Sequence, residues 1–218
     1  MTIKILNLYA GIGGNRKLWT GDIEVTAIEN VPEIAKIYQD FFPNDKVIIT
    51  DAHQYLLEHF KEFDFIWSSP PCPSHSRLRK TFNFANDKIR RRSSIYPDMR
   101  LYQEILFLQY YFKGRWVVEN VIAFYEPLIK PKELQRHWFW CNFVLTNKKI
   151  EGKDHIQFGK IKHYEKIQGF NLDNYKSIDK RTILRNCVRP ELGLHIFKMA
   201  FKEPQQTLTN LAGEKLTK

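Results

Sequence analysis

The sequence predicts an α/β fold whose mixed, mostly parallel sheet is flanked by helices. Two observations carry this prediction. Between residue 3 and about residue 145, short apolar runs of strand length alternate with segments in which apolar residues have helical spacing. Glycine, acidic or cysteine residues follow several of these runs, and the carboxyl ends of strands are where an open α/β sheet binds ligands.

Composition narrows the class of partner. The chain has 218 residues, a formal net charge of +10 and 14% aromatic residues, which favours nucleic acid first and a membrane surface second. Its three cysteines form no CxxC pair, so we expect neither a zinc site nor a disulfide framework. The cysteines are few and unpaired, and the sequence shows no signal peptide and no long apolar run. These features predict a cytoplasmic protein of prokaryotic or phage type.

The first strand is expected at residues 3–9, followed by a glycine turn at Gly11, Gly13 and Gly14 and a helix start at residues 15–19. A strand, a glycine turn and a helix bring backbone N–H groups against a nucleotide-like ligand. The spacing is G-x-G-G rather than G-x-G-x-x-G, which disfavours a dinucleotide. The alternative is a tight turn without a ligand.

Acidic residues end the next two expected strands. Residues 23–28 lead to Glu29, a helix follows at residues 32–41, and residues 46–50 lead to Asp51. A carboxylate after the second strand can accept hydrogen bonds from both hydroxyls of a ribose. Either residue alone could be a solvated loop carboxylate, but the glycine turn, Glu29 and Asp51 in this order indicate a cofactor that contains adenosine.

The fourth apolar run, at residues 63–67, ends before a cysteine. Pro70 and Pro71 have no backbone N–H, so a strand ladder cannot continue through them, and Cys72 follows directly. A thiol at this edge of the sheet is a candidate nucleophile, because a few per cent is thiolate even at its free pKa. The alternative is a buried structural cysteine.

Two basic clusters follow Cys72, at residues 77–80 and 88–92. Because they are of one sign and close to the cysteine, phosphate contact is favoured over a solvated face. The expected phosphate donors are Arg77, Arg79, Lys80, Arg90, Arg91 and Arg92.

The rest of the chain returns to the sheet. We expect a helix at residues 97–112, a strand at 116–118 that ends in Glu119, and a strand at 138–143 after Arg136 and His137. The catalytic domain is therefore assigned to residues 1–145. Residues 146–182 are expected to form a small, irregular, basic insert, residues 183–203 a segment with a final helix at 192–201 that returns to the catalytic domain, and residues 204–218 a frayed tail.

Taken together, these motifs resemble those of the DNA (cytosine-5) methyltransferases. The resemblance runs from residue 3 to about 200, through Asn-Leu-Tyr-Ala-Gly-Ile-Gly-Gly at 7–14, Glu29, Asp51, Pro-Pro-Cys at 70–72, Glu-Asn-Val at 119–121 and Arg-Asn-Cys-Val at 185–188. It implies a Rossmann-like fold dependent on S-adenosylmethionine, with S-adenosylhomocysteine as product. The implied activity is methylation of cytosine C5 in double-stranded DNA after base flipping, as in restriction-modification systems.

The resemblance also implies residue roles. Cys72 would be the nucleophile, Glu119 the carboxylate that contacts the base, and Arg136 a further base contact. The implied cofactor residues are Tyr9, Ala10, Gly11, Gly13, Gly14, Glu29, Asn30, Asp51, Ala52, Pro70 and Asn186. Ser76 is expected to contact DNA together with the six basic residues named above. No metal is expected.

The sequence departs from the family pattern in ways that leave alternatives open. Asn7 stands where the family usually has aspartate, Cys72 is followed by Pro73 where glutamine is common, and the Gln-x-Arg-x-Arg motif is reduced to Gln135-Arg136-His137. Either Arg136 or His137 could therefore contact the base. An inactive regulatory relative and an RNA cytosine-5 methyltransferase remain alternatives, and a second chain or self-association could complete target recognition.

Overall fold

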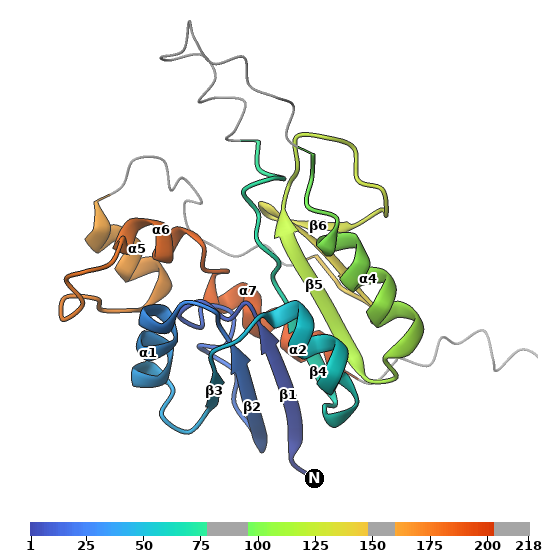
Figure 1. Ribbon diagram of the computed structural model, residues 1–218, viewed down its shortest axis with the longest axis horizontal. Helices are drawn as coiled ribbons and strands as arrows, with labels where there is room; N and C mark the ends of the chain where they lie inside the picture. The colour runs from blue at the N-terminus through green and yellow to red at the C-terminus, as the bar shows by residue number, and fades with distance from the viewer. Residues whose placement is uncertain (78–95, 148–159, 203–218) are drawn as a thin grey trace, which may run out of the picture.

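A computed structural model describes residues 1–77, 96–147 and 160–202 and contains one seven-stranded sheet (Figure 1). The strands are β1 (Ile3–Leu8), β2 (Ile23–Ile28), β3 (Lys46–Ile48), β4 (Phe65–Ser68), β5 (Arg115–Val121), β6 (Lys132–Leu134) and β7 (His137–Cys141). The helices are α1 (Pro32–Phe41), α2 (Ala52–His59), η1 (Phe60–Glu62), α4 (Arg100–Tyr111), α5 (Ile161–Gln168), α6 (Lys180–Arg185) and α7 (Pro190–Ala200).

The order of the strands is β3-β2-β1-β4-β5-β7-β6. The first five of these strands pair in parallel, while β7 is antiparallel to both β5 and β6. β1 and β4 are buried along most or all of their length, which explains why they read as continuous apolar runs. The predicted mixed, mostly parallel α/β sheet is confirmed.

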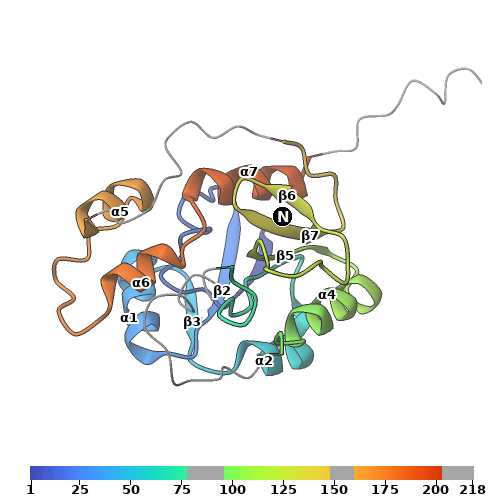
Figure 2. The same cartoon turned by 90° about the horizontal axis from the view of Figure 1, so that it is seen from above.

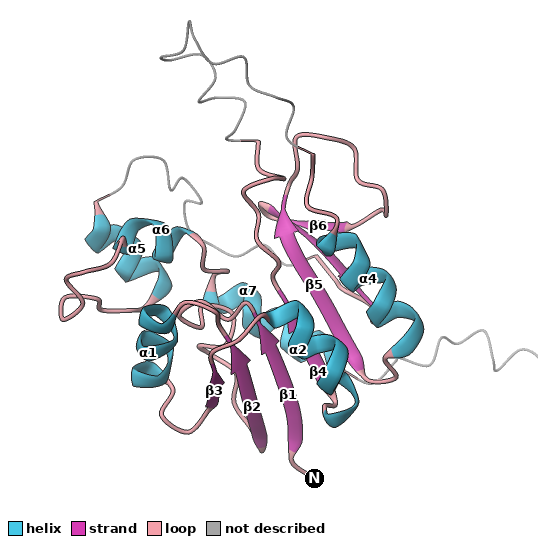
Figure 3. Ribbon diagram, in the orientation of Figure 1, coloured by secondary structure: helices cyan, strands magenta, loops and turns pink. Residues whose placement is uncertain are grey.

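Helices cover both faces of the sheet (Figures 2 and 3). On one face α2 and α4 pack through residues such as Leu56 and Leu108 against Leu6 and Ile66. On the other face α7 packs through Leu192 and its neighbours against Phe65 and Trp67, and α1 places Tyr38 beside Ala27. Because β1, β2, β4 and β5 run in the same direction, their carboxyl ends meet at one edge, where the residues with predicted roles gather.

The sequence pattern suggested that a helix begins at residues 15–19, but in the structure these residues form turns. The side-chain amide of Asn15 donates to Asn7 at 2.8 Å, and the Trp19 ring stacks on Phe197 of α7 with centroids 5.0 Å apart. Gly193 of α7 lies so close to Asn15 that a Cβ there would come within 2.3 Å of the Asn15 carbonyl. Tertiary contacts with α7 and β1 therefore hold this segment in a non-helical path.

Several element boundaries also differ from the prediction. β1 ends at Leu8, β3 ends at Ile48, α4 begins at Arg100 rather than at Pro97, and the last strand is His137–Cys141. Strand β6 and helix α2 were not predicted. The three residues of β6 include a single apolar position and carry too little pattern to identify a strand from sequence.

The described part of the expected irregular insert contains helix α5 and the first residues of α6, joined by a non-helical segment at 169–179. Helices α5 and α6 pack on α1 and the glycine turn through a buried cluster that includes Tyr164, Phe170 and Leu184. Gly169 ends α5 in the left-handed conformation, with φ of 68°. Residues 160–185 are thus joined to the main body, and the expected boundary at residue 182 does not separate an independent unit. Residues 148–159, the tail at 204–218 and the basic residues Arg79, Lys80, Arg90, Arg91 and Arg92 lie outside the described residues.

Candidate active site

The loop that carries Cys72 is held from two sides. The backbone N–H groups of His75 and Ser76 both donate to the Cys72 carbonyl, at 2.9 and 3.0 Å. The Asn120 side chain, only 2% exposed, donates to the Pro70 carbonyl at 2.9 Å. Because Asn120 belongs to β5, the neighbour of β4, the Pro-Pro-Cys loop is fixed to the strand that also carries Glu119.

Cys72 and Glu119 share one electrostatic environment. Burial raises the pKa of the Cys72 thiol, the negative charge of Glu119 raises it further, and Arg185 lowers it. Burial likewise raises the pKa of Glu119, against the opposing effects of His137 and of a hydrogen bond from Ser69. Cys72, which follows β4, therefore lies close enough to Glu119, within the neighbouring strand β5, for the two to interact electrostatically.

Of the two candidates for a further base contact, His137 lies nearer to Glu119. His137 pairs with Val121 across β5 and β7, so it is a diagonal neighbour of Glu119 on the same face of the sheet. Its Nε2 atom is 3.8 Å from Glu119 Oε1, and its buried Nδ1 atom has no hydrogen-bond partner among the described residues. Arg136 is exposed in the two-residue turn between β6 and β7, next to Gln135, whose φ is 54°.

Glu29 braces the glycine turn. Its buried carboxylate accepts hydrogen bonds from the backbone N–H groups of Gly11 and Val31, both at 3.0 Å. Each carboxylate oxygen has a second lone-pair site, so these two bonds leave capacity for the ribose hydroxyls that the sequence predicts.

The three glycines of the turn differ in their surroundings. Gly11 has φ of 54°, and a Cβ there would meet nothing within 4 Å. A Cβ at Gly13 would come within 2.4 Å of the Phe42 ring, and one at Gly14 within 2.6 Å of Cys187. Gly13 and Gly14 therefore allow close packing of the chain, while Gly11 leaves open space at the edge of the sheet.

The remaining predicted cofactor residues surround the same edge. Asp51 caps α2 by accepting from Gln54 N at 2.8 Å, and its other oxygen lies 3.4 Å from Arg100. Asn186, exposed at the C-terminal end of α6, precedes Cys187, which contacts the glycine turn. Tyr9 follows β1 with φ of 54°. Ala10, Ala52 and Pro70 are buried and Asn30 is exposed.

Two of the residues predicted at the DNA are described. Ser76 forms an isolated antiparallel bridge with Ala123, and the Arg77 Nε donates to the Ala123 carbonyl at 2.9 Å. The chain that leaves Cys72 is thus anchored to the segment after β5 before it enters residues 78–95.

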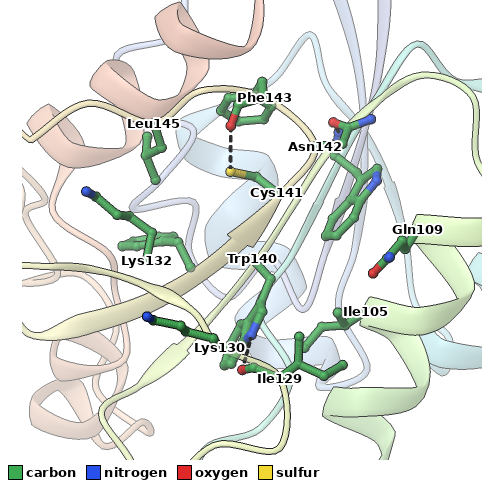
Figure 4. A pocket seen from close by; sticks show the side chains of 12 residues that line it. Ile105, Gln109, Ile129, Lys130, Lys132, Trp140, Cys141, Asn142, Phe143 and Leu145 are labelled. Atoms are coloured by element: carbon green, nitrogen blue, oxygen red, sulfur yellow. Dashed lines mark hydrogen bonds between the residues drawn. The ribbon is translucent and has the colours of Figure 1, made fainter.

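A cavity of about 490 Å³ lies away from this edge, between α4 and the end of β7 (Figure 4). Its lining includes Ile105 and Gln109 of α4 and Trp140 and Cys141 of β7. None of the predicted catalytic or cofactor residues lines it, so this cavity does not identify the site.

Part of the chain is similar in sequence to a known protein family. Residues 3–97 match the family model of C-5 cytosine-specific DNA methylases. The match covers less than half of the chain, and over those residues the chain is similar to this family. It spans β1 to β4, the glycine turn, Glu29 and the Cys72 loop.

Solved structures with a similar arrangement include a mutant of DNMT2 from Spodoptera frugiperda, with 27% identity and a TM-score of 0.38 over 55% of this chain and 35% of that chain. The methyltransferase EhMeth from Entamoeba histolytica has 14% identity and a TM-score of 0.44 over 75% of this chain and 60% of that chain. The chain thus covers about a third of the DNMT2 chain and under two thirds of the EhMeth chain. A search of curated proteins gave no match.

The residues present fit the implied cofactor. The open space at Gly11 lies beside the Glu29 carboxylate, and Asp51 presents an exposed carboxylate at the next strand end. Within residues 1–77, 96–147 and 160–202, no group of three His, Cys, Asp or Glu side chains could hold a metal ion. No helix in these ranges is long and apolar enough to cross a membrane.

Proposed function

We propose that this chain is a DNA (cytosine-5-)-methyltransferase in which Cys72 attacks a flipped cytosine. The observation that carries the proposal is the placement of Cys72 just after β4 and of Glu119 in the neighbouring strand β5, close enough for the charge of Glu119 to raise the pKa of the Cys72 thiol. The family match and the basic charge of +10 support DNA as the substrate.

The roles of the two residues follow from the chemistry of cytosine. C5 is a poor nucleophile, but addition of the Cys72 thiolate at C6 gives C5 enamine character. Burial raises the pKa of Glu119 and so favours the protonated acid, which can donate to ring N3 as charge develops there. Asn120 keeps the Cys72 loop in register with Glu119 through its bond to Pro70.

S-adenosylmethionine, when bound, supplies the electrophilic methyl group. We infer that Glu29 accepts from its ribose hydroxyls and that Asp51 accepts from its adenine amine. Tyr9, Gly11 and the Asn186 region form the walls around it. These roles fit the carboxylates and open space described above.

Target recognition has only a short segment of this chain available to it. Helices α5 and α6 pack on α1, which leaves residues 148–159 as the stretch between the sheet and these helices. We propose that phosphate contacts near Arg77 supply most of the affinity and that a second chain or self-association adds base reading.

Bisulfite sequencing of plasmid DNA from cells that express the protein tests the proposal. Converted and protected cytosines report activity and target sequence together, and a Cys72→Ser variant gives the background. An RNA cytosine-5 methyltransferase would protect cytosines in cellular RNA and leave the plasmid fully converted. An inactive relative would protect neither.

The Glu29 carboxylate should contribute measurably to cofactor binding. Replacing Glu29 with glutamine keeps the side-chain shape but removes the charge, so calorimetric binding of S-adenosylmethionine should weaken by about 1–3 kcal/mol. Glu24→Gln, a change at an exposed position of β2, is the matched control. Equal affinity of wild type and Glu29→Gln would remove Glu29 from the cofactor site.

His137, rather than Arg136, should be required for methylation. Its Nε2 atom lies 3.8 Å from Glu119, so His137→Ala should lower kcat by roughly tenfold to a hundredfold, as expected for loss of one polar contact to the reacting base. Arg136→Ala should mainly change DNA affinity and its salt dependence. The two variants are compared in steady-state assays at several DNA concentrations, and the reverse pattern would assign the base contact to Arg136.

A further inference from the structure

A buried carboxylate lies beneath the strand ends that form the candidate active site. Glu104 of α4 has no exposed surface. Its Oε1 atom accepts from the Tyr9 hydroxyl at 2.6 Å and lies 3.0 Å from His53 Nδ1, and its Oε2 atom accepts from the Ser68 hydroxyl at 2.5 Å. An isolated buried carboxylate is costly, so three partners explain how this one is accommodated.

The titration of its partners agrees with this geometry. Burial, followed by the charge of Glu104 and its hydrogen bond, holds the pKa of the Tyr9 hydroxyl well above its ordinary value, so Tyr9 remains a donor. The hydrogen bond to Glu104 also raises the pKa of His53 against the opposing effect of burial. Asp51 and Arg100 face the same cluster. The negative charge of Asp51 raises the pKa of both Tyr9 and His53, and the positive charge of Arg100 lowers both.

The three partners come from three separate parts of the chain. Tyr9 lies between β1 and the glycine turn, with a positive φ that a tyrosine rarely adopts. Ser68 is the last residue of β4, two positions before the Pro-Pro-Cys loop. His53 lies in the first turn of α2, directly after Asp51 and Ala52. One side chain therefore contacts the residue before the glycine turn, the last residue of the strand that leads to the nucleophile loop, and the helix that Asp51 caps.

We propose that Glu104 is a positioning residue that couples the cofactor side of the site, through Tyr9 and His53, to the Cys72 loop, through Ser68. This role rests on the proposed function. The two hydrogen bonds, which we call the two arms, have different consequences. The bond to Tyr9 positions the backbone just before the glycine turn, whereas the bond to Ser68 positions the backbone just before the loop that carries Cys72.

A residue that only stabilised the fold would change cofactor affinity and turnover together, in proportion to the unfolded fraction. Positioning through two arms makes a different prediction. Tyr9→Phe removes only the hydroxyl that reaches Glu104, so it should raise the dissociation constant of S-adenosylmethionine about threefold to tenfold and lower kcat by a smaller factor. Ser68→Ala should lower kcat by about threefold to tenfold and leave that dissociation constant unchanged.

The test compares these variants with Glu104→Gln, which keeps the volume and an accepting oxygen but loses the charge. We expect Glu104→Gln to weaken cofactor binding and lower kcat, each by about tenfold, at a thermal midpoint close to that of wild type. Adding Tyr9→Phe should weaken binding no further, and adding Ser68→Ala should lower kcat no further, because each bond is already weakened. Glu58→Gln, an exposed change on α2, is the control and should alter neither quantity.

Unchanged affinity and kcat in Glu104→Gln, or losses that simply add in the double variants, would overturn the coupling. If Glu104→Gln fails to fold, the single variants decide the matter, because equal effects of Tyr9→Phe and Ser68→Ala on both quantities would also overturn it. Failure of the proposed function looks different: the wild-type protein itself would neither bind S-adenosylmethionine nor methylate cytosine.

Discussion

Replacing Cys72 with serine should abolish the covalent complex with DNA that contains 5-fluorocytosine. Fluorine at C5 cannot leave as a proton, so once the ring is methylated the bond between Cys72 and C6 cannot be released by elimination. A serine hydroxyl is a far poorer nucleophile than a thiolate. We expect a gel-shifted adduct with wild-type protein and cofactor, no adduct with Cys72→Ser, and a loss of at least about a thousandfold in kcat, in line with other nucleophile deletions.

The other two cysteines provide the matched control. Burial raises the pKa of the Cys187 thiol to about 12. Cys141, the last residue of β7, donates its thiol to the Phe143 carbonyl. Cys141→Ser should therefore form the adduct normally. An adduct that survives Cys72→Ser and disappears in another cysteine variant would locate the nucleophile elsewhere.

The sequence was sufficient to predict the central part of the fold because the parallel strands are buried on both faces. Runs such as residues 3–8 and 65–67 are apolar for that reason and can be recognised without tertiary information. Residues 15–19 were mispredicted because contacts with Asn7 and α7 override local helical preference. The helices at residues 160–185 were missed because their apolar positions are few, and they become a buried cluster only against α1.

Some residues of the candidate site could likewise be predicted from the sequence, and others could not. Cys72 and Glu29 follow strand ends and Glu119 lies near the end of β5, where sequence order alone gives their approximate place in a parallel sheet. His137 faces Glu119 because β7 is antiparallel to β5, and no local pattern encodes that pairing. Glu104 was missed for a related reason: it lies in the middle of an apolar helix, and only the packing of α4 against β1 and β4 brings it to Tyr9 and Ser68.

Replacing Glu119 with glutamine should change methylation and thiol reactivity in opposite directions. Loss of the acid that contacts the base should lower kcat by roughly a hundredfold to ten-thousandfold. The negative charge of Glu119 is also a cause, after burial, of the raised pKa of Cys72. Glu119→Gln removes that charge, so the pKa of Cys72 should fall.

Alkylation by iodoacetamide, followed by mass spectrometry of the Cys72 peptide across pH, measures this shift. Only the thiolate reacts, so in the wild-type protein alkylation should rise with pH through a midpoint above the ordinary range of cysteine. In Glu119→Gln the midpoint should move to lower pH while the burial contribution remains. Cys141 in the same samples reports general loosening, because unfolding would accelerate its alkylation as well. A Cys72 midpoint that stays in place, or moves upward, would mean that Glu119 does not act on the thiol and that the two residues do not form one site.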